Sequence, residues 1–215
     1  YAFEDAMLVS IVKKKQGNGE EPEKPEDKEQ WYITPDEPSK GTSAYSIVSA
    51  RLSKILNDII KREKGYKFLR SEETTGTYDT TLIGDDNMQL FIPAQDFQPS
   101  IGVGIGRIDD VTEFENDSIQ ICSSIYEIVL DRPVIPDKPF TLTLKPDKSK
   151  VGELSPEQIS KLKIYWYNDI LKRWEYLGGQ YNSKTGTISV ELTHFSKYAL
   201  LYNEKIIKME DIRGR

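Results

Sequence analysis

The single histidine of this 215-residue chain lies two positions before a serine, in the triplet His194-Phe195-Ser196. In an extended strand the side chains of His194 and Ser196 would project to one face and Phe195 to the other. His194 could then act as a general base while the Ser196 hydroxyl attacks the carbonyl carbon of Phe195. This N-to-O acyl shift, followed by hydrolysis of the ester, would cut the chain between Phe195 and Ser196. The reaction requires a strained peptide bond at this position.

The same stretch also fits a purely structural role. If Phe195 fills the core of a sheet, His194 and Ser196 lie at the rim with backbone partners, and Thr193–Leu200 is a strand that closes the domain. We expect this structural role. Self-cleavage is the alternative, and in it His194 and Ser196 are the catalytic residues.

Aromatic side chains form a second candidate site, on two segments that flank the turn Asn168-Asp169. Alternation along a strand places Tyr165 and Tyr167 on one face, and Trp174 and Tyr176 also share a face. Rings exposed on a sheet can stack on sugar rings, which would make the four residues a carbohydrate-binding site. Aromatic pairs across buried strands instead stabilise a sheet by roughly 0.2–1 kcal/mol each. The sequence leaves both readings open.

Other motifs favour structural roles. In the run Gly102–Gly106 glycine alternates with apolar residues, which differs from the spacing of a dinucleotide-binding loop and is typical of a strand that another part of the chain approaches closely. The run Asp85-Asp86-Asn87 lacks the further ligands of a calcium loop and predicts a hairpin turn. Cys122, the only cysteine, is expected to be a small buried side chain. We expect no cofactor and no metal.

Composition limits the classes of partner. The net charge is −6 and the sequence pI is about 5.1, which disfavours binding to nucleic acid. No apolar run approaches the ~20 residues of a membrane span, so we expect no membrane insertion.

The chain divides into segments of different composition. Residues 1–12 predict a strand or the tail of a preceding domain, and the charged residues of 13–41, punctuated by glycine and proline, predict a linker. Apolar residues recur every three or four positions in 42–65, which predicts an amphipathic helix, capped by Thr42 or Ser43, that packs on the edge of the following domain or on residues 1–12. Residues 204–215 form a C-terminal tail.

From residue 78 to residue 203 the apolar period changes to two, with turn residues at short intervals. Short strands without long helices between them predict an antiparallel β-sandwich, so the fold class is mainly β. The predicted strands are Thr80–Ile83, Met88–Ile92, Ile101–Ile108, Ser118–Cys122, Tyr126–Leu130, Phe140–Leu144, Leu162–Tyr167, Arg173–Leu177, Thr187–Leu192 and Tyr198–Tyr202.

Several of these segments, in their order along the chain, resemble the ZU-five domain that zonula occludens proteins, ankyrins and netrin receptors share, and they resemble the version found in bacterial surface proteins more closely. The matching segments are Leu90–Ala94, Ile125–Ile128, Lys138–Leu144, Lys163–Tyr167, Trp174–Gly179, Thr185–Val190 and His194–Ala199. The resemblance implies a β-sandwich that serves as an interaction or spacer module. In some eukaryotic members the His-Phe-Ser triplet is a self-cleavage site. Gln95 and Asp96 depart from the small residues of the family's opening turn, and residues 1–70 have no counterpart.

Together these observations predict a non-enzymatic module that is extracellular or attached to the cell surface, with a protein or a cell-wall glycan as partner. Two alternatives stay open. One is self-cleavage at Phe195-Ser196, and the other is carbohydrate binding by the four aromatic residues.

Overall fold

The computed structural model describes residues 44–203, except residues 75, 96, 98–99, 116–118 and 153, and describes side chains from Ala50 onward. The segments 1–12, 13–41 and 204–215 and the predicted capping residues lie outside the described residues. The helices are α1 (Ala44–Arg62) and α2 (Pro156–Ser160). The strands are β1 (Tyr66–Thr74), β2 (Thr80–Asp85), β3 (Met88–Ile92), β4 (Ile101–Ile108), β5 (Gln120–Ile121), β6 (Ile125–Leu130), β7 (Phe140–Leu144), β8 (Lys163–Asn168), β9 (Arg173–Gly178), β10 (Gln180–Asn182), β11 (Thr187–Leu192) and β12 (Lys197–Tyr202).

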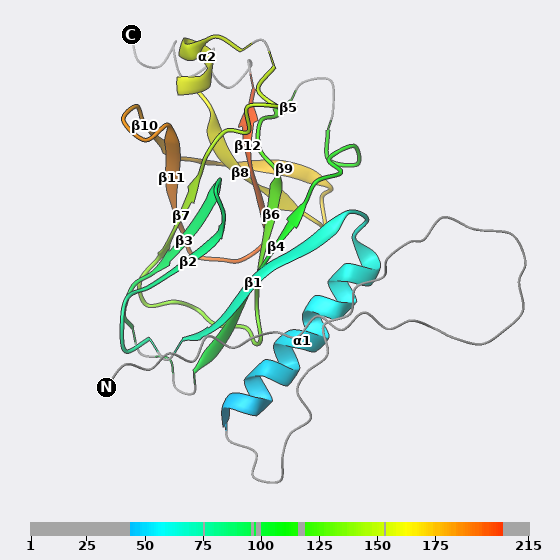
Figure 1. Cartoon of the computed structure of the whole chain (residues 1–215), viewed down its shortest axis with the longest axis vertical. Coiled ribbons are helices and arrows are strands. Elements are labelled where there is room, and N and C mark those ends of the chain that lie inside the picture. The colour runs from blue at the N-terminus through cyan, green and yellow to red at the C-terminus, as the bar shows by residue number, and fades with distance from the viewer. Residues whose placement is uncertain are drawn as a thin grey trace, which may run out of the picture.

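The strands form two antiparallel sheets that pack face to face (Figure 1). The large sheet has the order β1-β4-β6-β12-β8-β9, and β5 also pairs with β12. The small sheet has the order β10-β11-β7-β3-β2. The predicted mainly-β antiparallel sandwich is therefore confirmed.

The core lies between the inner faces of the two sheets, where alternate residues of each strand meet. Leu90 of β3 and Phe140 of β7 come from the small sheet, and Ile105 of β4 and Leu200 of β12 come from the large sheet; all four are fully buried. At roughly 25 cal/mol for each Å² of apolar surface removed from water, this contact between the sheets is the main source of stability.

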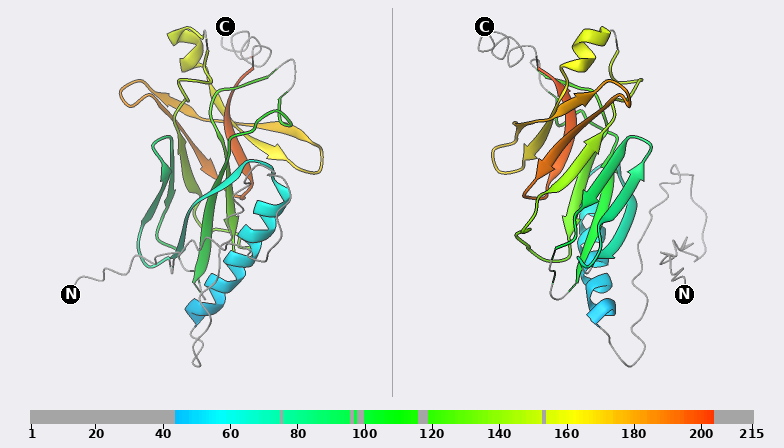
Figure 2. Two further views of the ribbon diagram at one scale, coloured as in Figure 1. Left: turned by 45° about the vertical axis from the view of Figure 1, so that its right-hand side comes forward. Right: turned by 90° about the vertical axis from the view of Figure 1, so that its left-hand side faces the viewer.

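The outer face of the large sheet is also covered. Helix α1 packs against β1, β4 and β6 through Leu52, Leu56 and Ile59, which are 5% exposed or less. The left panel of Figure 2 shows α1 and the small sheet on opposite sides of the large sheet. The expectation that the helix packs on an edge is corrected, because a face several strands wide buries its apolar stripe more completely. Gly65, with φ +74°, ends the helical segment in the left-handed conformation that glycine adopts most readily.

The glycines of β4 make room for this cover. A Cβ atom on Gly104 would lie 3.2 Å from Leu56, and one on Gly106 would lie 2.0 Å from the Tyr66 ring. The predicted close approach at Gly102–Gly106 is thus confirmed, and the approaching groups are α1 and Tyr66.

Strand prediction failed where apolar alternation is absent. β1, which carries charged residues at Lys67 and Arg70 and pairs with β4, is not among the predicted strands, and neither is the three-residue β10. The large sheet therefore includes residues that precede position 78. Ser155 caps α2, whose first residue is Pro156, and the Ser155 hydroxyl accepts a hydrogen bond from the Gln158 amide at 3.2 Å.

Candidate functional site

The triplet His194-Phe195-Ser196 lies in a bend between β11 and β12, and β12 begins only at Lys197. The predicted strand Thr193–Leu200 is therefore wrong in its first half. β11 belongs to the small sheet and β12 to the large sheet, so the chain must cross from one layer to the other here. The crossing also removes the strict alternation of faces that the sequence predicted for the triplet.

Each side chain of the triplet has a different neighbour. The Phe195 ring packs on Phe140 at a centroid distance of 4.8 Å, and the His194 ring lies 4.8 Å from that of Trp166. Ser196 donates its hydroxyl hydrogen bond to the carbonyl of Tyr167 at 3.1 Å. Nε2 of His194 is buried without a hydrogen-bond partner, and burial lowers the pKa of this imidazole. His194 is therefore neutral at pH 7, but the Ser196 hydroxyl is directed away from it toward Tyr167.

The four aromatic residues lie on the outer face of the large sheet, as alternation predicted for each pair. The Tyr165 and Tyr176 rings meet at 5.4 Å, and those of Tyr167 and Trp174 at 5.2 Å. Phe114, from the loop after β4, packs on Tyr167 and Trp174, and its carbonyl accepts a 2.8 Å bond from the Trp174 indole. Tyr165, Tyr167 and Trp174 are 7% exposed or less, and Tyr176 is 42% exposed. An enclosed ring offers no face to a sugar, so in this structure the four residues do not form an exposed stacking platform.

A group of charged residues that was not selected from the sequence lies beside these aromatic rings. Its centre is Lys197, the first residue of β12, whose side chain is only 1% exposed. The Lys197 Nζ atom lies 3.0 Å from Oδ2 of Asp169, 3.3 Å from Oε1 of Glu63 and 3.7 Å from Oε1 of Glu127. Arg62 contacts both Glu63 and Glu127 at 3.1 and 3.9 Å. We call these five residues the Lys197 cluster.

The elements of the fold explain how the cluster forms. Lys197 pairs with Glu127 of β6 on one side and with Tyr167 of β8 on the other, so its side chain shares their outer face. Asp169 follows β8 in the turn to β9, and the end of α1 brings Glu63 over the sheet. A fully buried lysine is rare unless it is paired, and here three carboxylates pair with it.

In the Lys197 cluster, burial and the neighbouring charges shift the pKa of each group in opposite directions. Burial acts to lower the pKa of Lys197, but Glu127, Asp169 and Glu63 outweigh it and hold the pKa above its ordinary value. Burial raises the pKa of the Glu127 carboxyl, which Lys197 offsets only in part. The Oε2 atom of Glu127 and the hydroxyl of nearby Tyr66 are buried without hydrogen-bond partners. The cluster is thus enclosed and incompletely bonded.

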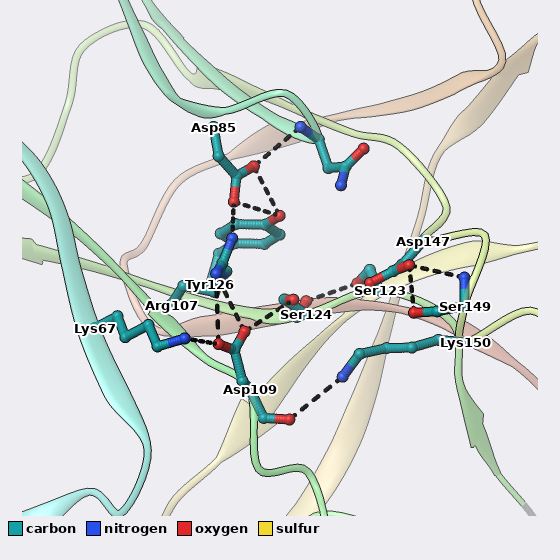
Figure 3. A network of polar contacts seen from close by, with 11 residues as sticks. Lys67, Asp85, Arg107, Asp109, Ser123, Ser124, Tyr126, Asp147, Ser149 and Lys150 are labelled. Carbon is teal, nitrogen blue, oxygen red and sulfur yellow. Dashed lines mark hydrogen bonds and ion pairs between the residues drawn. The ribbon is translucent and has the colours of Figure 1, made fainter.

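A second polar group links the two sheets (Figure 3). Arg107 of β4 contacts Asp85 of the small sheet and Asp109, each at 2.8 Å. The Tyr126 hydroxyl donates to Asp85 at 2.9 Å, and Lys67 contacts Asp109 at 2.7 Å. We call these five residues the Arg107 network. It joins the sheets, and it gives Asp85 the structural role in a hairpin turn that the sequence predicted.

The sequence contained one signal for the Lys197 cluster. Lys197, Ala199 and Leu201 occupy alternate positions, and the last two are buried on the outer face. A lysine in phase with buried residues indicates a buried charge if the whole face is covered.

Cys122 is fully buried as expected, and burial raises the pKa of its thiol to about 12. Among the described residues no three His, Cys, Asp or Glu side chains are placed to hold a metal ion.

Comparison with known proteins gives two partial matches, and no family model matches the chain. A stretch of 68 residues, 32% of this chain, is 35% identical to a segment of an amylopullulanase from Thermoanaerobacterium thermosulfurigenes and spans 3% of that protein. A stretch of 134 residues, 59% of this chain, is 26% identical to a protein from Evansella cellulosilytica whose name assigns it provisionally to the membrane proteins, and spans 19% of it. The chain therefore corresponds to a small part of either relative.

Proposed function

We propose that this chain is a non-enzymatic spacer module of an extracellular or cell-surface protein. The observation that carries the proposal is the placement of the ends of the described chain. α1 begins at one end of the long axis and β12 finishes near the opposite end, in Figure 1 and in the left panel of Figure 2. A domain with opposed ends separates the segments before and after it by its full length.

The covered faces support a spacer more than a binding site. The inner face of the large sheet is covered by the small sheet, and much of its outer face by α1 and Phe114. Among the described residues, Tyr78, Ile83 and Ile135 are large exposed apolar side chains on separate segments, whereas Ile170, Leu171 and Tyr176 lie together on the β8–β9 hairpin. Singly exposed apolar side chains are normal for a protein surface.

The relatives support a role within a longer protein. The matched segment of the amylopullulanase is 68 residues, which is shorter than a typical catalytic domain. We infer that such a segment accompanies a larger enzyme rather than performing its chemistry, and that this chain does the same for its own neighbours. A surface location follows if the resemblance to the second relative extends to its membrane association. Among the described residues, no helix combines the length and apolar character needed to cross a bilayer.

Domain replacement in the parent protein tests the spacer role. Residues 44–203 are exchanged for an unrelated β-sandwich whose termini also lie at opposite ends, and for a second one whose termini lie at the same end. A spacer tolerates the first exchange and fails with the second. Loss of the parent protein's function in both exchanges would show that a specific surface of this chain is needed. Cleavage of the chain by protease added to intact cells tests the location.

Self-cleavage and carbohydrate binding stay as alternatives with direct tests. Self-cleavage needs the Ser196 hydroxyl to leave the Tyr167 carbonyl and approach the carbonyl of Phe195. Two fragments in a denaturing mass spectrum, abolished by Ser196→Ala, would establish it. Carbohydrate binding would require Phe114 to move off the aromatic face, and binding to cell-wall glycan that is lost in Trp174→Ala would establish it.

A further inference from the structure

The Lys197 cluster holds an enclosed amine against the carboxylate of a half-exposed Asp169. Nζ of Lys197 lies 3.1 Å from Oδ1 and 3.0 Å from Oδ2 of Asp169, so it is about equally far from the two oxygens that flank Cγ. Reacting atoms held about 3–3.5 Å apart have the geometry of a near-attack conformer. Lys197 is 1% exposed and cannot exchange this partner for water.

A proton carrier lies beside this pair. Oε1 of Glu127 is 3.7 Å from Nζ of Lys197, its side chain is 8% exposed, and its Oε2 atom has no hydrogen-bond partner. A carboxyl group that burial keeps readily protonated can accept a proton from an amine and return it to a departing oxygen. Glu63 lies closer to Lys197, at 3.3 Å, but it also accepts a 3.1 Å hydrogen bond from Arg62, which is 3.9 Å from Glu127.

We propose that Lys197 and Asp169 condense to an isopeptide bond, with Glu127 transferring the protons. The bond forms between Nζ of Lys197 and Cγ of Asp169, and one Cγ–Oδ bond breaks. The ammonium group carries three protons; two leave with the departing oxygen as water and one stays on the amide nitrogen. Charge balances, because an ammonium and a carboxylate become a neutral amide, and no other reactant is required.

Two physical effects favour this condensation. The buried ammonium group of Lys197 carries a desolvation penalty, and formation of a neutral amide removes its charge. Because the fold holds the two groups together, the reaction is intramolecular. Effective molarities of well-oriented intramolecular reactions reach roughly 10⁵–10⁸ M. The side chain of Asp169 is 52% exposed, which gives the released water a path to solvent. Because Lys197 must first lose a proton to a neighbouring carboxylate, the reaction is expected to follow folding slowly.

The bond would join β12 to the β8–β9 turn across 28 residues of sequence. It would close a covalent loop from Asp169 to Lys197 that contains β9, β10 and β11, and it would tie the start of β12 to the end of β8. The inference does not depend on the spacer role, since the bond forms or fails to form whatever the parent protein does.

The test is mass spectrometry on the full chain, purified in the folded state and then denatured. The expected result is a mass lower by one water molecule, and a tryptic map in which cleavage after Lys197 is missing and its peptide is joined to the one that contains Asp169. The map is needed because hydrolysis between Phe195 and Ser196 would add one water and restore the intact mass.

Single substitutions test whether Asp169 supplies the carbonyl carbon of the bond and whether Glu127 transfers the protons. Asp169→Ala leaves Lys197 paired with Glu63 and Glu127, so it should fold and keep the full mass. Asp169→Asn should form the same amide with loss of ammonia instead of water. Glu127→Gln should slow or stop the reaction while circular dichroism shows a folded protein. A folded wild-type chain that keeps its full mass after prolonged incubation, with normal cleavage after Lys197, overturns the proposal.

Discussion

The Lys197 cluster and the Arg107 network lie on opposite faces of the same sheet, and neighbouring residues supply both. In β6, Tyr126 points between the two sheets to Asp85, whereas Glu127 points outward to Lys197. In β4, Arg107 points inward and Gly106 lies beneath Tyr66 on the outer face. The two groups use similar side chains, so their differences come from what covers them.

The cover differs in how completely it excludes water. Arg107 is 27% exposed and Asp109 is 36% exposed, so the network between the sheets stays partly solvated at the rim. Lys197 is 1% exposed and Glu127 is 8% exposed beneath α1. Partly solvated charges contribute little to stability, whereas charges that are fully enclosed depend strongly on their partners. This difference in exposure predicts that removing a charge from the Lys197 cluster lowers the free energy of unfolding more than removing a charge from the Arg107 network.

The largest effect is expected for Lys197→Ala. Removal of the amine leaves the buried Glu127 and the partly buried Glu63 with only Arg62 to offset them, and loss of one partner of a buried ion pair costs about 3–5 kcal/mol. Chemical denaturation should show this fall in the free energy of unfolding. Adding Glu127→Gln to the variant should recover part of it. A loss below about 1 kcal/mol would mean that water reaches the cluster and that the contrast between the two groups is wrong.

Gly106→Ala should cost about 2–3 kcal/mol through overpacking. The added methyl group would lie 2.0 Å from the Tyr66 ring, so the ring and α1 must move off the sheet. Hydrogen exchange should increase in α1 and much less in β3 and β7 on the small sheet. The double variant Gly106→Ala, Tyr66→Leu should recover stability, and failure to do so would place the strain elsewhere.

Arg107→Ala should cost less, about 1–2 kcal/mol, because Asp85 keeps its bond from Tyr126 and Asp109 keeps Lys67. The same denaturation experiment measures it beside Lys197→Ala. Arg107→Lys serves as the control that keeps the charge but loses one of the two contacts. An effect equal to that of Lys197→Ala would remove the distinction between rim and interior.

The two groups should also show opposite pH dependence. Burial raises the pKa of Glu127, so the folded state binds the proton more tightly and this residue adds stability as the pH falls through the folded pKa. Burial acts to raise the pKa of Asp109, but Lys67 and Arg107 outweigh it and lower the pKa. Its contribution is therefore present above the unfolded pKa and is lost as the pH falls through the folded pKa. Denaturation midpoints of Glu127→Gln and Asp109→Asn against wild type, from pH 8 to pH 3, should therefore diverge in opposite directions.

The smallest effect concerns His194, whose position between β11 and β12 belongs to neither group. Because burial lowers its pKa, NMR should show this single imidazole titrating below 6.5 in the folded protein. The folded state then binds its proton less tightly, so stability falls slightly as the pH drops below 6.5. His194→Gln should remove this slope. A titration above 6.5 would place a carboxylate beside the ring.

Prediction from the sequence succeeded where a local pattern has one physical cause. Strands β3, β4, β7 and β11 have the predicted bounds, because each alternates apolar residues between turn signals. β1 escaped prediction because it is an edge strand whose pattern is interrupted by charged residues. The bend at His194 escaped because nothing in the triplet marks the point where the chain changes sheets.

The sequence by itself determined the fold class, the amphipathic helix and the close approach over the β4 glycines, since each depends on periodicity or on the absence of a Cβ atom. It also determined that Tyr165 and Tyr167 share a face, because alternation is a property of the strand alone. Only the tertiary structure decided that this face is covered, that Ser196 is turned toward Tyr167, and that Lys197 is enclosed with three carboxylates. Burial depends on segments distant in sequence. The charge of Lys197 by itself indicates a solvated position, and only the fold shows that Glu63, just after α1, and Glu127 of β6 lie against it.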